Sequence, residues 1–158
     1  QEARKKLLIS LQQVLPGKIA YQDEIVALNK SHCTVLKNVI ANYGWPTLSE
    51  FGKETCQHAW LIVQHANHDH DFQQSCLNLM QQLPEPEIEK RLIAYLYDRI
   101  CINNKKPQRY GTQINNETWQ PLELEQPELV DQFRESMNLE PLAPYLDFCK
   151  KAHEKFIT

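Results

Sequence analysis

The spacing of glycine and proline constrains this chain more than any other feature of its sequence. Only four glycines occur among 158 residues, and long stretches contain neither glycine nor proline. Within those stretches apolar residues recur every three to four positions, which is the period of an amphipathic helix. The sequence therefore predicts an all-α, multi-helix bundle, with residues 1–158 in a single domain that is large enough to bury a core.

Seven helices follow from this pattern. The run Ala59–Val63 places apolar side chains on every side of its helix, so that helix is expected at the centre. A side-chain oxygen of Thr47 or Ser49 is expected to cap its first turn, and Pro127 suits the first turn of a later helix. The expected helices span residues 2–15, 19–42, 49–66, 69–83, 87–101, 127–138 and 141–156.

Residues 102–126 lose the helical period and gather asparagine, proline, glycine and threonine. We expect one long irregular loop here, with a small β-hairpin within it as the alternative. Loops of this length inside a compact domain are usually functional. The segment is therefore the first place to look for a site.

Composition excludes several classes of function. The net charge is −3, so no positive field attracts nucleic acid, and no apolar run approaches the roughly 20 residues of a membrane-spanning helix.

The five cysteines lack CxxC spacing and are expected in the core, with at least one free thiol because their number is odd. No nucleotide-binding glycine motif is present, and no cofactor is expected. The chain begins at Gln1, so a missing upstream segment is expected, and cytoplasmic and exported locations both stay open.

Gln64 and His65 directly follow the apolar run, so at least one of them is expected to lie against the core. A buried polar group needs a partner, because leaving it unpaired costs about 1–3 kcal/mol. We take both as candidate site residues. The alternative is a histidine bonded to a backbone carbonyl, the commoner role of a lone buried histidine.

Asp98 and Arg99 close the helix expected at residues 87–101. Arg99 continues an apolar row of that helix, so its guanidinium is expected to face inward and to pair with a carboxylate, a carbonyl or an anionic ligand. Asp98 falls on another row. The alternative is an ion pair that ties this helix to its neighbour.

A third group of candidate residues surrounds Gly111 in the long loop. Their side chains have fixed hydrogen-bonding geometry, and the glycine allows a close backbone approach, so the segment is expected to contact a ligand. The alternative is a turn whose polar groups bond to their own backbone. The candidates are Gln108, Tyr110, Thr112 and Gln113.

The motifs Gly44–Thr47, Trp60–Ala66, Asp98–Arg99 and Gln108–Gln113 together resemble the signature of a bacterial domain family of unknown function. The resemblance covers about residues 43–145. It extends to Arg134 and to Asn138, which stands where the family has glycine but also tolerates the left-handed conformation. Members often follow a secretion signal or lie within larger exported proteins, so the resemblance implies an exported or effector role. It also implies that the motif residues form one site, and it implies no reaction.

Two functions fit these candidates. In the favoured one, the domain is an enzyme of hydrolase or transferase type in which His65 is the general acid or base, Asp98 orients it and Tyr110 is a second acid. In the other, it binds a small molecule, a peptide or another protein without chemistry. Catalysis requires a protonatable residue 65, whereas binding tolerates His65→Gln. In both functions the ligand-contacting residues are Gln64, Arg99, Gln108, Thr112 and Gln113.

A metal site is a weaker interpretation of the cluster His65, His68, Asp69, His70 and Asp71. These residues fall at a helix junction rather than on one helical face. The two aspartates suit a helix N-terminus, where they cap backbone N–H groups and favour the dipole. The fixed ligand spacing of a structural zinc site is missing, and no metal is expected.

Overall fold

The structure is a computed structural model that describes residues 22–157, and the helix expected over residues 2–15 lies outside them. The chain divides into two units, the first ending at Leu92 and the second beginning at Ile93. Helix α5 (Lys90–Asn103) runs through this boundary. The prediction of a single domain stays a prediction.

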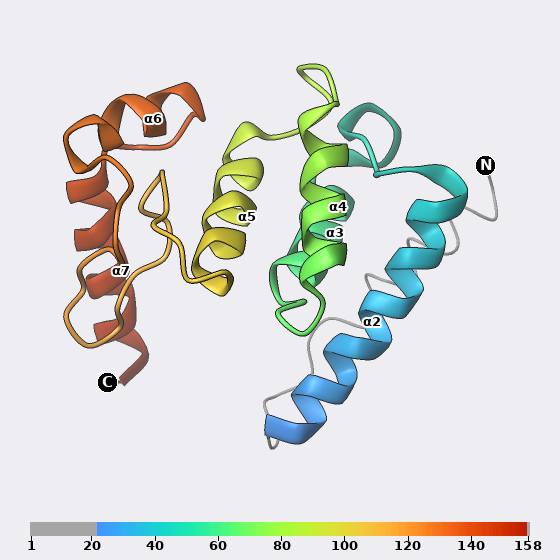
Figure 1. Cartoon of the computed structure of the whole chain (residues 1–158), viewed down its shortest axis with the longest axis horizontal. Helices are drawn as coiled ribbons and strands as arrows, with labels where there is room; N and C mark the ends of the chain where they lie inside the picture. The colour runs from blue at the N-terminus through green and yellow to red at the C-terminus, as the bar shows by residue number, and fades with distance from the viewer. Residues whose placement is uncertain (1–21, 158) are drawn as a thin grey trace. The chain divides into compact units, whose positions relative to one another are not determined.

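The first unit contains α2 (Gln22–Tyr43), α3 (Leu48–Gln64) and α4 (His70–Gln81), labelled in Figure 1. Helix α3 contacts both α2 and α4, as its apolar run predicts. Within that run Ala59, Ile62 and Val63 are buried, whereas Trp60 and Leu61 are half-buried. The rest of this core comes chiefly from Leu36, Val39, Cys56, Cys76, Leu77 and Met80.

The cap of α3 differs from the expected one. Thr47 is the N-cap residue, but its side chain makes no cap hydrogen bond. The Glu87 carboxylate instead accepts from the backbone N–H of Ser49 at 3.0 Å and from its hydroxyl at 2.8 Å. The expectation of a cap from Thr47 or Ser49 was wrong because a residue 38 positions away supplies the acceptor. Asp69 caps α4 as expected, accepting from the Phe72 N–H.

The second unit contains the rest of α5, the long loop, a short 3-10 helix (Pro127–Leu129), α6 (Val130–Ser136) and α7 (Leu142–Ile157). The described residues hold no β-strand, which confirms the all-α fold. The hairpin considered for the loop is reduced to two isolated bridges, Gln108 with Leu124 and Ile114 with Pro121. Asn138 adopts a left-handed conformation with φ of 56° after α6, as asparagine permits.

Two further findings concern membrane-spanning helices and the cysteines, both of which the sequence analysis considered. Among the described residues, no helix combines the length and the hydropathy that a membrane crossing requires. All five cysteines are free thiols: Cys33, Cys56 and Cys76 are buried, and Cys101 and Cys149 are half-buried.

Candidate functional site

The Asp98 carboxylate organises the long loop. Oδ1 accepts the backbone N–H groups of Arg109 at 2.9 Å and Tyr110 at 3.1 Å. Oδ2 accepts both the backbone N–H and the hydroxyl of Thr112, each at 2.9 Å. Asp98 is 0% exposed, so both oxygens are used within the protein.

Burial raises the pKa of the Asp98 carboxyl, and its four hydrogen bonds act in the opposite direction. Three of the four donors are backbone amides, which cannot turn away unless the loop changes conformation. Asp98 therefore fixes the backbone of residues 109–112 from the side of α5. The sequence predicted that Arg99, rather than Asp98, lies on the inward-facing row of α5. The structure corrects this, because Asp98 is fully buried whereas Arg99 is only half-buried.

Gln108 closes the same loop from within. Its Oε1 accepts the backbone N–H of Gln113 at 2.9 Å, and its Nε2 donates to the carbonyls of Gln113 and Leu122 at 2.8 and 3.0 Å. Gln113 Nε2 donates to the Thr112 hydroxyl. All three polar side chains predicted to bind a ligand here are buried, and their hydrogen bonds run to the loop and to Asp98.

Arg134 and Tyr145 hold the carbonyl side of the loop. Arg134 Nη1 donates to the Tyr110 carbonyl at 2.7 Å, and its Nε donates to the Glu140 carbonyl at 2.6 Å. The Tyr145 hydroxyl donates to the Thr112 carbonyl at 3.0 Å, and its ring lies 4.7 Å from the Arg134 guanidinium carbon. Arg134 is 0% exposed. The loop is thus fixed by a buried anion on its amide side and a buried cation on its carbonyl side.

Gly111 lies between these two anchors. Its φ of +65° is left-handed, and a Cβ added there would meet the Leu142 side chain at 2.9 Å. The backbone conformation therefore favours glycine, whereas the Leu142 methyl lies at the end of a flexible side chain and can shift to admit a Cβ. The neighbour found at this glycine is the Leu142 side chain of α7, and the ligand contact expected there stays a prediction.

Aromatic side chains from α5, the loop and α6 cluster around the Arg109 guanidinium. The Arg109 guanidinium carbon lies 5.1 Å from the Tyr97 ring centre and 5.6 Å from that of Phe133. Arg109 Nε also donates to Glu125 at 3.0 Å, and the rings of Tyr97 and Tyr110 meet edge to face at 5.7 Å. Burial raises the pKa of the Tyr110 phenol above its ordinary value, which makes it a weaker acid than a free tyrosine. Tyr97 and Phe133 were not predicted from the sequence, and Arg109 was predicted only as part of the motif Gln108–Gln113, although arginine beside tyrosine there was a usable signal.

Arg99 is the charged residue of α5 that pairs with no group among residues 22–157. Its Nε is buried and makes no hydrogen bond within the described part of the chain. The residue as a whole is half-buried, and burial lowers its pKa with no contribution from a neighbouring charge. The carboxylate or carbonyl expected to pair with it is therefore not found among the described residues.

Gln64 and His65 belong to the first unit, at the end of α3. Gln64 is buried and His65 is exposed, so one of the two lies against the core, as expected. The His65 N–H donates to the Leu61 carbonyl in the last turn of α3. The single site that would join these residues to Asp98 and the loop stays a prediction. Residues 22–157 contain no group of three or more histidine, cysteine, aspartate or glutamate side chains that could hold a metal ion.

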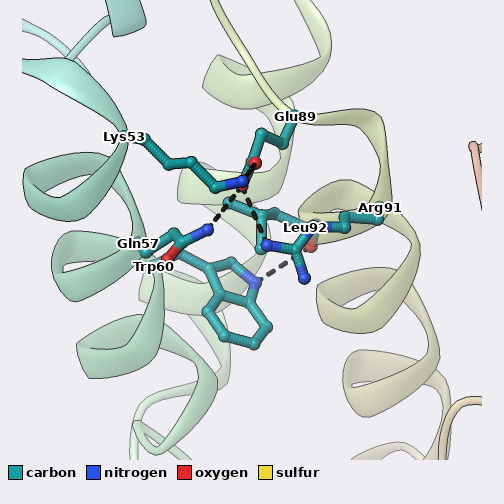
Figure 2. Close-up of polar contacts among 6 residues, drawn as sticks. All are labelled: Lys53, Gln57, Trp60, Glu89, Arg91 and Leu92. Atoms are coloured by element: carbon teal, nitrogen blue, oxygen red, sulfur yellow. Dashed lines mark hydrogen bonds and ion pairs between the residues drawn. The ribbon is translucent and has the colours of Figure 1, made fainter.

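A second polar cluster, missed from the sequence, lies in the first unit around Glu89. Figure 2 shows Lys53 and Gln57 of α3 meeting the Glu89 carboxylate together with Arg91 of α5. The distances are 2.9 Å from Lys53 Nζ, 2.8 Å from Gln57 Nε2 and 3.1 Å from Arg91 Nη2. Burial raises the pKa of Glu89, but these donors outweigh it and the pKa lies below its usual range. Beside them, the Trp60 indole donates to the Leu92 carbonyl at 2.9 Å.

Comparison with known proteins adds a family. A family model described as a family of unknown function, DUF6624, matches residues 16–156. No curated protein and no solved structure matches the chain. The family match confirms the resemblance to a domain family of unknown function. Since it spans most of the sequence, this chain belongs to DUF6624.

Proposed function

We propose that this protein is a binding domain for an anionic ligand, which Arg99 contacts through its guanidinium. The observation that carries the proposal is a half-buried arginine whose Nε has no partner among the described residues. A guanidinium does not lose its proton inside a protein, so this charge persists. Holding a charge away from water without a partner is costly, and an anion bound beside it removes that cost.

The geometry around Asp98 supports binding over acid–base chemistry. Asp98 uses both oxygens on the loop and is fully buried, so it has no oxygen left to orient a histidine or to carry a proton. We assign Asp98 to positioning the loop. Fixing a loop in advance lowers the entropy cost of binding a ligand, which is what a recognition site requires.

An enzyme remains the second candidate, and Tyr110 is the residue that favours it. Asp98 accepts its backbone N–H and Arg134 donates to its carbonyl, so its phenol is a positioned proton donor, although burial raises the phenol pKa and weakens it as an acid. The test follows ligand identification: esters and amides of the bound anion are incubated with wild type and Tyr110→Phe, and product release is followed by NMR. Turnover by wild type that Tyr110→Phe lacks would favour the enzyme over the binder.

The binding proposal is tested by thermal unfolding in sodium acetate, phosphate or sulfate, each compared with sodium chloride at equal ionic strength. At least one oxyanion is expected to raise the Tm of wild type, because a ligand that binds only the folded state stabilises it. Arg99→Gln should lose this response. Arg91→Gln removes the same charge from the same helix and should keep it, since Arg91 already pairs with Glu89.

The unliganded variants give an independent result. Arg99→Gln is expected to melt at or above wild type, because a residue kept for binding is often held at a cost to stability. A response to oxyanions that is the same in wild type and Arg99→Gln would contradict the proposal. So would a clear loss of Tm in Arg99→Gln without any ligand effect in wild type, since that pattern belongs to a structural arginine.

A further inference from the structure

We infer that Arg99 binds its ligand side-on, with Nε–H and one Nη–H donating to two oxygens of a single carboxylate or phosphate group. This inference rests on the proposed function and specifies the chemistry of the same site. It starts from which atom of Arg99 lacks a partner. Among the described residues no group bonds to its Nε, the buried nitrogen at the base of the guanidinium.

The planarity of the guanidinium turns this observation into a prediction about the ligand. Nε–H and the nearer Nη–H lie along one edge and point in parallel directions, at a spacing that matches two oxygens on one atom. An anion held only by the terminal nitrogens would leave Nε without a hydrogen-bond partner. An anion that satisfies the buried Nε must therefore engage this edge after the side chain turns it toward the ligand, which selects an oxyanion and disfavours a halide.

The charges along this part of the chain favour an external anion over an internal carboxylate. Asp98, the neighbouring acid on α5, is fully used by the loop. The next charged side chains are Lys105 and Lys106, both exposed just beyond the end of α5. Arg109 follows and is paired with Glu125. Residues 99–109 thus add positive potential, which concentrates anions near Arg99.

Side-on binding predicts a difference between arginine and lysine at position 99. Lysine keeps the charge but offers a single point donor without the planar fork. Arg99→Lys is therefore expected to bind the oxyanion at least tenfold more weakly than wild type. Arg91→Lys, the matched change at a half-exposed arginine of the same helix, is expected to leave the affinity unchanged.

The experiment uses the full chain and the arginine Nε–H region of the ¹H–¹⁵N NMR spectrum. Acetate and inorganic phosphate are titrated separately, with chloride at equal ionic strength as reference. The Arg99 signal, identified by its absence in Arg99→Lys, should shift and saturate with acetate, phosphate or both, and not with chloride. A response to acetate alone indicates a carboxylate ligand such as an amino acid or a peptide terminus, and a response to phosphate alone indicates a phosphorylated ligand.

The outcomes separate this inference from the proposed function. If an oxyanion binds but the Arg99 Nε–H signal does not move, or Arg99→Lys binds as well as wild type, the side-on geometry is overturned and anion binding stands. If neither acetate nor phosphate binds to wild type through Arg99, the proposed function itself fails. Should Arg99→Lys prove unfolded, Arg99→Gln identifies the signal and the wild-type titration decides.

Discussion

Glu89 in the first unit and Asp98 in the second are both carboxylates that accept several hydrogen bonds, but their donors differ in kind. Glu89 is partly exposed, with 17% of its side chain accessible, and it receives three side chains, two of them cationic. Asp98 is fully buried and receives three backbone amides and one hydroxyl. The Glu89 donors can swing into water when the acceptor is lost, whereas the Asp98 donors cannot.

The same contrast extends through the buried polar groups of each unit. In the first unit they are neutral, for example His32 at 4% exposure and Gln73, which donates to the Val63 carbonyl at 3.0 Å. In the second unit two of them are charged, Asp98 and Arg134, and each bonds to loop backbone. Charge at the surface ties helices together at little cost. Charge in the interior determines a loop conformation, and removing it is expensive.

The largest expected effect is that of Asp98→Ala. It leaves four donors without an acceptor in a site that water does not reach, so the free energy of unfolding should fall by roughly 3–5 kcal/mol. Urea unfolding followed by circular dichroism measures the loss. Asp98→Asn keeps the shape and one accepting oxygen and should lose about half as much. A loss below about 1 kcal/mol for the alanine variant would mean that Asp98 stabilises the protein no more than the partly exposed Glu89 does, which would contradict the contrast between the two carboxylates.

Arg134→Met tests the cationic anchor and should rank second. The change leaves the Tyr110 and Glu140 carbonyls without their donor, while removing a buried charge offsets part of the cost, so we expect a loss of roughly 1–3 kcal/mol. The same urea titration applies. Arg91→Met, at a half-exposed arginine, is the control and should lie within about 0.5 kcal/mol of wild type. A variant at position 134 that unfolds like this control would show that the carbonyl side of the loop needs no anchor.

A pH titration tests the neutral interior of the first unit. Burial lowers the pKa of His32 below its ordinary value of 6.5, so the unfolded chain binds this proton more tightly than the folded one. The stability from His32 is therefore complete above pH 6.5 and is lost as the pH falls through the folded pKa. Wild type should lose stability below pH 6.5 more steeply than His32→Gln, measured by urea unfolding at several pH values. Parallel curves for the two proteins would contradict this account of His32.

Glu89→Gln should have the smallest effect, about 0.5–1 kcal/mol, because its ion pairs are partly exposed. The donors keep the pKa of Glu89 below its usual range, so its contribution is present above the ordinary pKa and fades as the pH falls below it. High salt should reduce the difference between wild type and variant. A difference that salt leaves unchanged, or one as large as that of Asp98→Ala, would mean that Glu89 behaves as a buried charge.

Most of the helices could be predicted from the sequence because their apolar period is strong and glycine and proline separate them. The structure has α2 at Gln22–Tyr43 and α7 at Leu142–Ile157, within a few residues of the expected 19–42 and 141–156. The predictions that were wrong concern features that depend on tertiary contacts. Glu87 caps α3 from 38 residues away, and no pattern within the helix could reveal that.

Residues of the candidate site could be predicted from the sequence, but which of their side chains are most deeply buried could not. A single apolar row placed Arg99 inward, which assumed that α5 has one buried face. Asp98 lies on another row that the loop covers, so it is buried more deeply than Arg99. Arg134 entered only through the family resemblance, although its position four residues after the buried Val130 was a signal that it faces the core.

The most direct test of this account is native-state amide exchange of Arg109, Tyr110 and Thr112, resolved by NMR in wild type and Asp98→Asn. Their N–H groups donate to Asp98, so in wild type they should exchange as slowly as amides in the core of the second unit. In Asp98→Asn the amides that face the new NH2 group lose their acceptor and should exchange at least tenfold faster, with the α7 amides much less affected. Equal protection of the three amides in both proteins would contradict the claim that Asp98 holds the loop.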